Sequence, residues 1–207
     1  MSTREASSHA QRATVTVPAT SANLGPGYDC LGVALDLRDE YHAELSTQPG
    51  VRVHVTGEGA DTLPRDHTNL VASSFLRCFE HLGDSPPVGV DIHCRNAIPH
   101  GRGMGSSSAA TVGGLALGRA MSLRGDELPD YALLEFATEL EGHPDNVAPA
   151  VYGGFTISWV EKGVGRAVRL HPHPEVVPVM AVSPTPLSTA AARDLMPTEV
   201  PLADAIF

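Results

Sequence analysis

The chain has 207 residues, which is enough to bury one good core, or one core and the beginning of a second domain. Hydrophobic residues make up 42% and charged residues 18%, as is usual for a soluble globular protein. The formal charge of −10 argues against nucleic acid or an anionic membrane as the main partner, because neither attracts a net acidic surface.

The three cysteines, Cys30, Cys78 and Cys94, are too few and too scattered for a disulfide framework or a zinc site. We therefore expect reduced thiols in a cytoplasmic protein. No apolar run approaches about 18 residues, and the first residues lack the apolar region of a secretion signal. These features predict a protein without a membrane partner.

The first half of the chain indicates strands around one helix. Residues 1–12 are polar and small and are predicted to be a disordered lead-in. A helix is expected over 69–82, where apolar residues keep one face and Gly83 ends the helix. A loop of turn-forming residues is expected over 18–29. Apolar alternation predicts strands over 13–17, 31–37, 41–45, 51–55 and 88–94.

The second half begins with helices and returns to strands. Residues 107–121 are small and apolar, as expected of a helix packed closely on a sheet. Further helices are expected over 129–140, from Asp145, over 188–195 with Ser188 as N-cap, and from Ala203. Strands are expected over 155–160, 164–170 and 176–182. This order predicts an α+β domain and the start of a second domain near residue 160.

Residues 99–109 read PHGRGMGSSSA, a glycine-rich loop between a predicted strand and a predicted helix. Glycines permit close approach of the backbone to a ligand, and the helix dipole directs its positive end at an anion, so the segment suits a phosphate group. It is neither a Walker A loop, which needs a lysine, nor a dinucleotide-binding fingerprint, because Ser106 replaces the third glycine. The alternative is a simple glycine-rich turn in which Ser106 caps the helix.

The same loop is similar to the second signature of the GHMP kinases, with Met104 in place of the commoner leucine. The resemblance implies that the loop holds the triphosphate of ATP and that Ser107 lies close to Mg²⁺. The implied ATP-binding residues are Asn69, Pro99, His100, Gly101, Arg102, Gly103, Met104, Gly105, Ser106, Ser107, Ser108 and Ala109.

Residues 17–32, VPATSANLGPGYDCLG, resemble the N-terminal motif of the homoserine kinases within that family. Asn23 and Asp29 lie on a loop whose glycines allow it to fold over a small ligand, and a carboxylate suits the ammonium group of an amino acid. The resemblance implies that both residues bind substrate. The alternative is a surface turn in which the two side chains make only local backbone bonds.

Residues 141–154, EGHPDNVAPAVYGG, resemble a second homoserine kinase motif. The resemblance implies that His143 and Asn146 face the amino-acid substrate and that Glu135 binds Mg²⁺. Other GHMP kinases have an aspartate at the position of Asn146; since an asparagine cannot accept a proton, transfer would depend on positioning and charge neutralisation. Asp145 is a further catalytic candidate. The alternative is a joint between helices, with Asp145 as N-cap and His143 as a bystander.

Two weaker matches complete the resemblance. Asn69 corresponds to a position near the adenine or ribose. Arg193, in a segment similar to a third homoserine kinase motif, corresponds to an arginine that faces the substrate carboxylate, which a planar guanidinium can grip with two hydrogen bonds. The alternative for Arg193 is a solvated helix residue.

The resemblance implies the α+β GHMP kinase fold. Residues 13–160 would form the N-terminal ATP-binding domain, of the ribosomal-protein-S5-domain-2-like type, and residues 161–207 an incomplete, ferredoxin-like C-terminal domain. In the family a third glycine-rich motif follows, so we expect this 207-residue chain to be C-terminally truncated and of doubtful activity by itself.

The resemblance implies the ATP-dependent phosphorylation of L-homoserine to O-phospho-L-homoserine, a step of threonine biosynthesis. Two alternatives stay open: another small-molecule GHMP kinase, such as one acting on mevalonate, and a non-catalytic nucleotide-binding remnant. We expect no nucleic-acid partner and hold a homodimer as a hypothesis.

Overall fold

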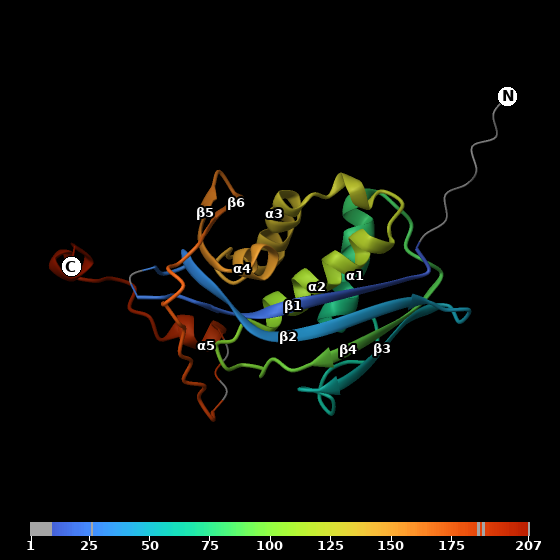
Figure 1. The fold of residues 1–207 in the computed structure, drawn as a ribbon, viewed down its shortest axis with the longest axis horizontal. Helices are drawn as coiled ribbons and strands as arrows, with labels where there is room; N and C mark the ends of the chain where they lie inside the picture. Colours follow the sequence, from blue (N-terminus) through green and yellow to red (C-terminus); the bar gives the residue numbers. More distant parts are fainter. Residues whose placement is uncertain (1–9, 26, 186, 188, 207) are drawn as a thin grey trace.

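The computed structural model describes residues 10–25, 27–185, 187 and 189–206. Its six strands form one mixed sheet, and helices α1 to α4 lie on one face of that sheet (Figure 1). The strands are β1 (Arg12–Ala22), β2 (Leu31–Leu45), β3 (Gly50–Gly57), β4 (Gly89–Asn96), β5 (Phe155–Glu161) and β6 (Val164–Leu170). The helices are α1 (Leu70–Leu82), α2 (Ser106–Met121), the 3₁₀ turn η1 (Gly125–Glu127), α3 (Asp130–Glu141), α4 (Val147–Tyr152), α5 (Thr189–Asp194) and α6 (Leu202–Ile206). The predicted α+β class is confirmed.

The long strand β2 organises the sheet. Strand β1 pairs with it antiparallel along one edge. Its other edge is shared, because residues 31–33 pair with β5 and residues 40–45 pair with β4. Strands β3 and β4 are parallel, and α1 forms the crossover between them, as a parallel pair requires. This arrangement brings the ends of β1 and β4 toward the start of α2.

The core lies between the sheet and helices α1 and α2. Tyr41 from β2, Phe75 from α1 and Leu115 from α2 are all fully buried there. The two helices approach closely because α2 has glycines at the contact: a Cβ on Gly114 would lie 2.3 Å from the carbonyl oxygen of Val71. A Cβ on Gly113 would lie 2.3 Å from the ring of Tyr41 on β2, so the prediction of a helix packed closely on a sheet is confirmed.

The ends of α1 are those that the sequence predicts. Asn69 is the N-cap, and its side-chain oxygen accepts a hydrogen bond from the backbone of Val71 at 3.0 Å. Gly83 ends the helix in the left-handed conformation, with φ of 61°. The predicted strands at 51–55, 155–160 and 164–170 are also present, as are the helices at 107–121 and 129–140, within one or two residues at each end.

Three predictions about strands are wrong. Residues 18–22, expected in a loop, continue β1, because 20–22 pair with 32–34 beyond a register shift. The two strands expected at 31–37 and 41–45 are the single strand β2. Residues 176–182 form no strand: within the described chain they have no strand partner, and apolar alternation gives a strand only where a neighbour supplies hydrogen bonds.

The predicted domain boundary at residue 160 falls inside the β5–β6 hairpin. Strand β6, which begins in the predicted second domain, completes the sheet of the first by pairing with β5. The division into two domains stays a prediction. The helix expected at 188–195 is α5, and its expected N-cap, Ser188, lies outside the described residues.

Within the described part of the chain, no helix is both long and apolar enough to cross a membrane.

Candidate nucleotide and substrate site

The glycine-rich loop is anchored where it leaves β4. The carboxylate of Asp39, on β2, accepts hydrogen bonds from the backbone amides of Ala97 and Ile98 at 2.7 and 2.9 Å. It also accepts one from the hydroxyl of Tyr41 at 2.9 Å. Asp39 is only 1% exposed, so these three donors balance the cost of burying its charge. Residues 99–109 therefore begin from a fixed point of the sheet.

The loop itself depends on three glycines in the left-handed region. Gly101, Gly103 and Gly105 have φ values of 65°, 69° and 67°, which other residues adopt at a cost. Gly105 is also tightly enclosed, because a Cβ there would lie 2.0 Å from the hydroxyl oxygen of Thr20. Gly105 precedes α2, so the loop ends at a helix N-terminus, as the sequence predicts.

A carboxylate lies beside the serines at the start of α2, and it belongs to Glu141. The hydroxyl of Ser107 donates to both of its oxygens, at 3.2 and 3.1 Å. Ser108 donates to Glu141 at 3.2 Å and Thr111 at 2.6 Å. Three hydroxyls and one carboxylate thus gather at one point, and all of them are the hard oxygen ligands that Mg²⁺ prefers.

Glu135, which the sequence singles out for the metal, has a different partner. Its carboxylate forms an ion pair with Arg166 on β6. Glu141 is the first residue of the motif over 141–154, and the resemblance implies no role for it. The signal that could have identified Glu141 is its place at the last turn of α3, directly before the turn that carries His143 and Asn146.

A cavity of about 180 Å³ lies next to the loop. Ser106 and Ser107 line it together with Asn69 and His100, so four of the predicted ATP-binding residues meet there. Its remaining lining residues come from β2, the segment before α1, α1, β4 and α2: Asp39, Tyr41, Leu63, Leu70, Val71, Cys94, Asn96 and Ala110. Asp39, Tyr41 and Asn96 belong to none of the motifs, and the sequence does not predict them at the site.

Two asparagines in this cavity differ in what their side chains offer a ligand. The amide of Asn69 is used within the protein, since its oxygen caps α1 and its nitrogen donates to the carbonyl of Pro64 at 2.9 Å. Asn96 is 7% exposed, and its nitrogen donates to the carbonyl of Glu58 at 3.0 Å. Its oxygen has no hydrogen-bond partner among the described residues. A buried acceptor in this state favours a ligand that donates a hydrogen bond.

Burial controls the ionisation of the groups around this cavity. It raises the pKa of the Tyr41 hydroxyl well above its usual value, and the neighbouring Asp39 carboxylate adds to the effect. Tyr41 therefore stays protonated and continues to donate to Asp39. Burial also raises the pKa of the Cys94 thiol to about 12, so this cysteine is a neutral wall residue and not a nucleophile.

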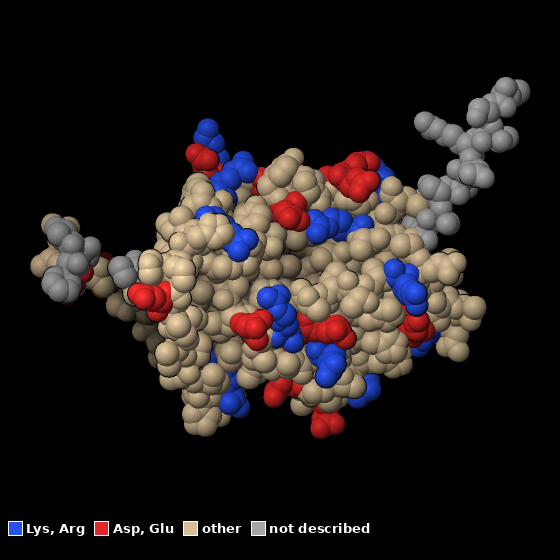
Figure 2. Space-filling view, in the orientation of Figure 1, with Lys and Arg blue, Asp and Glu red and all other residues tan. Residues whose placement is uncertain are grey.

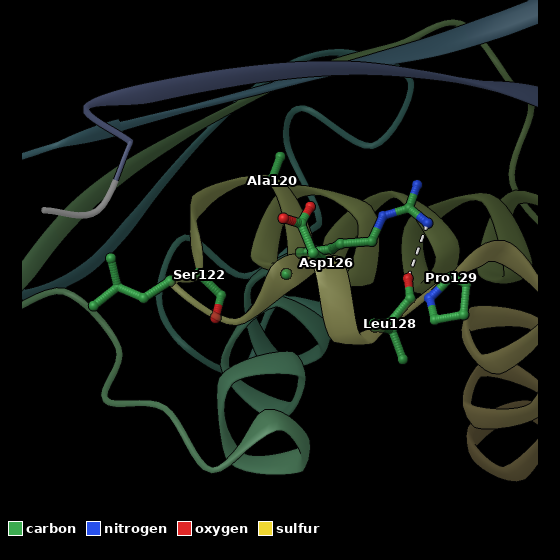
Figure 3. A pocket seen from close by; sticks show the side chains of 8 residues that line it. Ala120, Ser122, Asp126, Leu128 and Pro129 are labelled. Atoms are coloured by element: carbon green, nitrogen blue, oxygen red, sulfur yellow. Dashed lines mark hydrogen bonds between the residues drawn. The ribbon is translucent and has the colours of Figure 1, made fainter. Parts of the chain in front are cut away.

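A larger cavity, of about 430 Å³, opens at the other end of α2 (Figure 3). Leu128, Pro129, Ser122 and Asp126 line it, and the carbonyl of Leu128 accepts a hydrogen bond from Arg119 at 3.2 Å. The guanidinium of Arg119 also pairs with Asp130 at 2.7 Å. None of the sequence motifs contributes to this cavity, so we place the candidate site at the smaller one.

The turn between α3 and α4 presents a buried acid beside a histidine. Asp145 is 1% exposed, and its oxygen lies 2.5 Å from Nδ1 of His143. The same oxygen accepts the backbone amide of Asn146 at 2.9 Å. Asp145 therefore fixes the orientation of the His143 ring and the start of α4. The side-chain oxygen of Asn146 accepts a hydrogen bond from Thr20 at 2.9 Å, so this turn also contacts β1.

In the N-terminal motif, Asn23 and Asp29 form a local hydrogen bond with the backbone, as expected for the surface turn that was the alternative to substrate binding. The side-chain oxygen of Asn23 accepts the backbone amide of Asp29 at 2.8 Å, and both residues have positive φ, 58° and 52°. Pro26 in the same loop lies outside the described residues. Arg193 has its backbone in α5, and its side chain also lies outside what the structure describes.

Figure 2 shows a face of mixed charge, on which basic side chains stand next to acidic ones and form no continuous basic area. Within the described residues, no group of three or more histidine, cysteine or acidic side chains is arranged to hold a metal ion. A cation at Ser107 and Glu141 would therefore depend on hydroxyls and on oxygens of a bound phosphate.

Comparisons with known proteins agree with the motifs. Residues 69–154 match the family model described as the GHMP kinases N terminal domain. The homoserine kinase of Streptomyces coelicolor is 50% identical over 192 residues, which are 92% of this chain and 62% of that protein. The homoserine kinase of Clavibacter michiganensis is 47% identical over 204 residues, 99% of this chain and 64% of that protein.

Solved structures share the fold. The crystal structure of homoserine kinase from Cytophaga hutchinsonii superposes with a TM-score of 0.75 at 33% identity, covering 98% of this chain and 65% of that chain. The mevalonate kinase of Methanococcus jannaschii gives a TM-score of 0.58 at 14% identity, which is a likeness of fold alone. The chain spans somewhat less than two thirds of the length of the relatives it matches, 62% for the first of them.

Proposed function

We propose that this chain is the nucleotide-binding and substrate-binding part of an ATP-dependent homoserine kinase of the GHMP kinase family. The observation that carries the proposal is the meeting of three sequence motifs at one place. The end of β1, the glycine-rich loop and the turn before α4 are joined by hydrogen bonds through Thr20. The reaction would convert L-homoserine to O-phospho-L-homoserine, a step of threonine synthesis in the cytoplasm.

The unpaired oxygen of Asn96 supports an adenine nucleotide. Adenine carries an exocyclic amino group that can donate to this acceptor, whereas guanine presents a carbonyl oxygen at the corresponding position. Asn69 contributes by holding the start of α1 at the edge of the same cavity. We therefore place the base near Asn96 and the phosphates on the loop.

The loop would hold the phosphates through backbone amides. Left-handed glycines turn consecutive N–H groups toward one side, and the start of α2 adds its partial positive charge. The segment contains no lysine, so this field replaces the point charge that other phosphate loops use.

Ser107 and Glu141 would hold Mg²⁺, with Ser108 and Thr111 keeping the carboxylate in place. The ion would neutralise charge on the phosphate oxygens as transfer proceeds. Glu135 stays the prediction from the sequence, but its ion pair with Arg166 favours Glu141 for this role.

L-homoserine would lie beside the turn that carries His143 and Asn146. Asp29 and Arg193 suit its ammonium and carboxylate groups, and Asn23 shapes the loop that carries Asp29. Asp145 would act indirectly, by holding His143 through Nδ1. A requirement for both charged ends of the substrate would separate this enzyme from kinases of simple alcohols.

In the reaction, the homoserine hydroxyl oxygen forms a bond to the γ-phosphorus, the bond to the bridging oxygen breaks, and ADP leaves with that electron pair. The hydroxyl proton ends in solvent. Asn146 cannot accept that proton, so its contribution is to orient groups and to donate hydrogen bonds. A loose transition state makes small demands on a base, which supports such a role.

The test is to incubate the protein with ATP, Mg²⁺ and L-homoserine and to detect phosphohomoserine by mass spectrometry. We expect any phosphorylated product to come from L-homoserine and not from homoserine analogues that lack the amino or the carboxyl group. Product from mevalonate in place of homoserine would indicate another small-molecule kinase. Nucleotide binding without transfer to any of these acceptors would indicate a non-catalytic binding protein.

A further inference from the structure

Thr20, at the bend of β1, contacts both halves of the site. It is fully buried. Its backbone amide donates to the carbonyl of Met104 in the glycine-rich loop at 3.0 Å. Its hydroxyl donates to the side-chain oxygen of Asn146 at 2.9 Å, across 126 positions of sequence. One residue of the first motif therefore joins the phosphate loop to the turn that carries Asn146.

The carbonyl end of the Asn146 amide faces Thr20, where its oxygen accepts the proton of the Thr20 hydroxyl. Because the amide is planar, its nitrogen then points away from Thr20. Gly105 closes the third side: a Cβ there would lie 2.0 Å from the Thr20 hydroxyl oxygen and 3.2 Å from the Asn146 side-chain oxygen.

The backbone around Asn146 is fixed as well. Its amide donates to the buried carboxylate of Asp145 at 2.9 Å, and its carbonyl accepts the amide of Ala150 at 3.3 Å. The residue therefore has its main chain held by α4 and its side-chain oxygen held by Thr20. The remaining freedom, rotation of the amide, is what the Thr20 hydroxyl removes.

We propose that Thr20 is a positioning residue that holds the Asn146 amide with its nitrogen, a hydrogen-bond donor, directed at the group being transferred. The inference rests on the proposed phosphoryl transfer at this site. In this orientation Asn146 can donate to a phosphoryl oxygen as negative charge develops, and its own oxygen is engaged. A side chain at position 20 that lacked a hydroxyl would let the amide turn over and present an acceptor to the phosphate.

Two substitutions separate the hydroxyl from the shape of the side chain. Thr20→Val keeps the branched shape and the backbone bond to Met104 and removes the hydroxyl. Thr20→Ser keeps the hydroxyl and removes a methyl group. A purely structural role would make the two variants similar, or the serine variant worse, because serine leaves a void in a buried position.

The first test needs no turnover. In ¹⁵N-labelled protein, the side-chain amide resonances of Asn146 are assigned by their loss in Asn146→Ala. We expect Thr20→Val to shift these resonances and Thr20→Ser to leave them close to the unsubstituted protein, with the backbone amides of α2 unmoved in both variants. Unchanged resonances in Thr20→Val would overturn the inference, whether or not the protein is a homoserine kinase.

The second test uses a double-mutant cycle on kinase activity. We expect Thr20→Val to lower kcat about tenfold or more with the KM for ATP within about twofold, and Thr20→Ser to restore most of kcat. In an Asn146→Ala background, Thr20→Val should cause no further loss, since it acts through Asn146. Full additivity, or equal losses in the valine and serine variants, would refute the positioning role. If this 207-residue chain has no kinase activity, the amide resonances alone decide the positioning role.

Discussion

Asn96 lines the cavity and has a buried side-chain oxygen without a hydrogen-bond partner among the described residues, and this gives a prediction about nucleotide choice. In the unsubstituted protein we expect ATP to bind about tenfold or more tightly than GTP or a purine nucleotide without the amino group, because only adenine donates to the acceptor from an amino group at position 6 of the purine. Asn96→Ala should reduce this preference to about threefold or less. Calorimetric titration with the three nucleotides measures the dissociation constants from which the preference is calculated. An undiminished preference in the variant would place recognition of the base elsewhere.

Glu135 and Glu141, two of the acidic residues of α3, lead to opposite expectations for metal dependence. Glu141→Gln keeps the size of the side chain and removes the charge beside Ser107, so half-saturation by Mg²⁺ should rise about tenfold or more. Glu135→Gln is the matched control, and should change half-saturation less than about threefold, because its partner is a partly exposed Arg166. Initial rates against Mg²⁺ concentration measure both. The reverse order would restore Glu135 as the metal ligand.

The glycine-rich loop gives a prediction that compares two of its own glycines. Gly103 and Gly105 have nearly the same φ, 69° and 67°, so replacement by alanine costs each about 1–2 kcal/mol of conformational energy. A Cβ on Gly103 meets nothing within 4 Å, whereas one on Gly105 would lie 2.0 Å from the Thr20 hydroxyl oxygen. Gly105→Ala should therefore destabilise the protein by about 1–3 kcal/mol more than Gly103→Ala.

Urea unfolding of the two variants, followed by circular dichroism, checks the difference in free energy of unfolding. Gly105→Ala should also weaken nucleotide binding more than Gly103→Ala, because β1 or the start of α2 must move. Equal free energies of unfolding for the two variants would mean that β1 and the loop can move apart at Thr20 and Gly105 without destabilising the protein.

The reactivity of the three cysteine thiols reports how tightly the whole molecule is packed. Cys78 and Cys94 are 0% and 3% exposed, and burial raises the pKa of each thiol to about 12. Since the raised pKa disfavours the thiolate, only about one thiol in 10⁴ is reactive at pH 8. Cys30 is half-buried.

We therefore expect iodoacetamide at pH 8 to modify Cys30 first in the folded protein and all three cysteines in urea. The reactivity of Cys78 and Cys94 should rise as the pH approaches about 12. Mass spectrometry of peptides from a time course gives the rates. Rapid native labelling of Cys94 would show that the nucleotide cavity opens down to β4.

Helix ends and tight turns of this protein can be predicted from its amino-acid sequence. The start of α1 at Asn69, its end at Gly83 and the loop glycines before α2 follow from capping and left-handed conformations, which depend on a few adjacent residues. The likeness to the GHMP kinases is local in the same way, because each motif is a short run of adjacent residues and the family model matches residues 69–154.

Which side chains from distant parts of the sequence lie close together is known only from the tertiary structure. Glu135 and Glu141 are six residues apart on α3, which turns them about 120° away from each other around the helix axis, and spacing could not tell which one faces α2. Asp39 and Asn96 could not be predicted as site residues from the sequence. Asp39 accepts hydrogen bonds from backbone amides that are distant in sequence, and Asn96 is distinguished by a side-chain oxygen that has no hydrogen-bond partner among the described residues. The strand expected at 176–182 failed for the same reason: a strand exists only where another chain segment supplies its hydrogen bonds, and no local pattern records whether one is there.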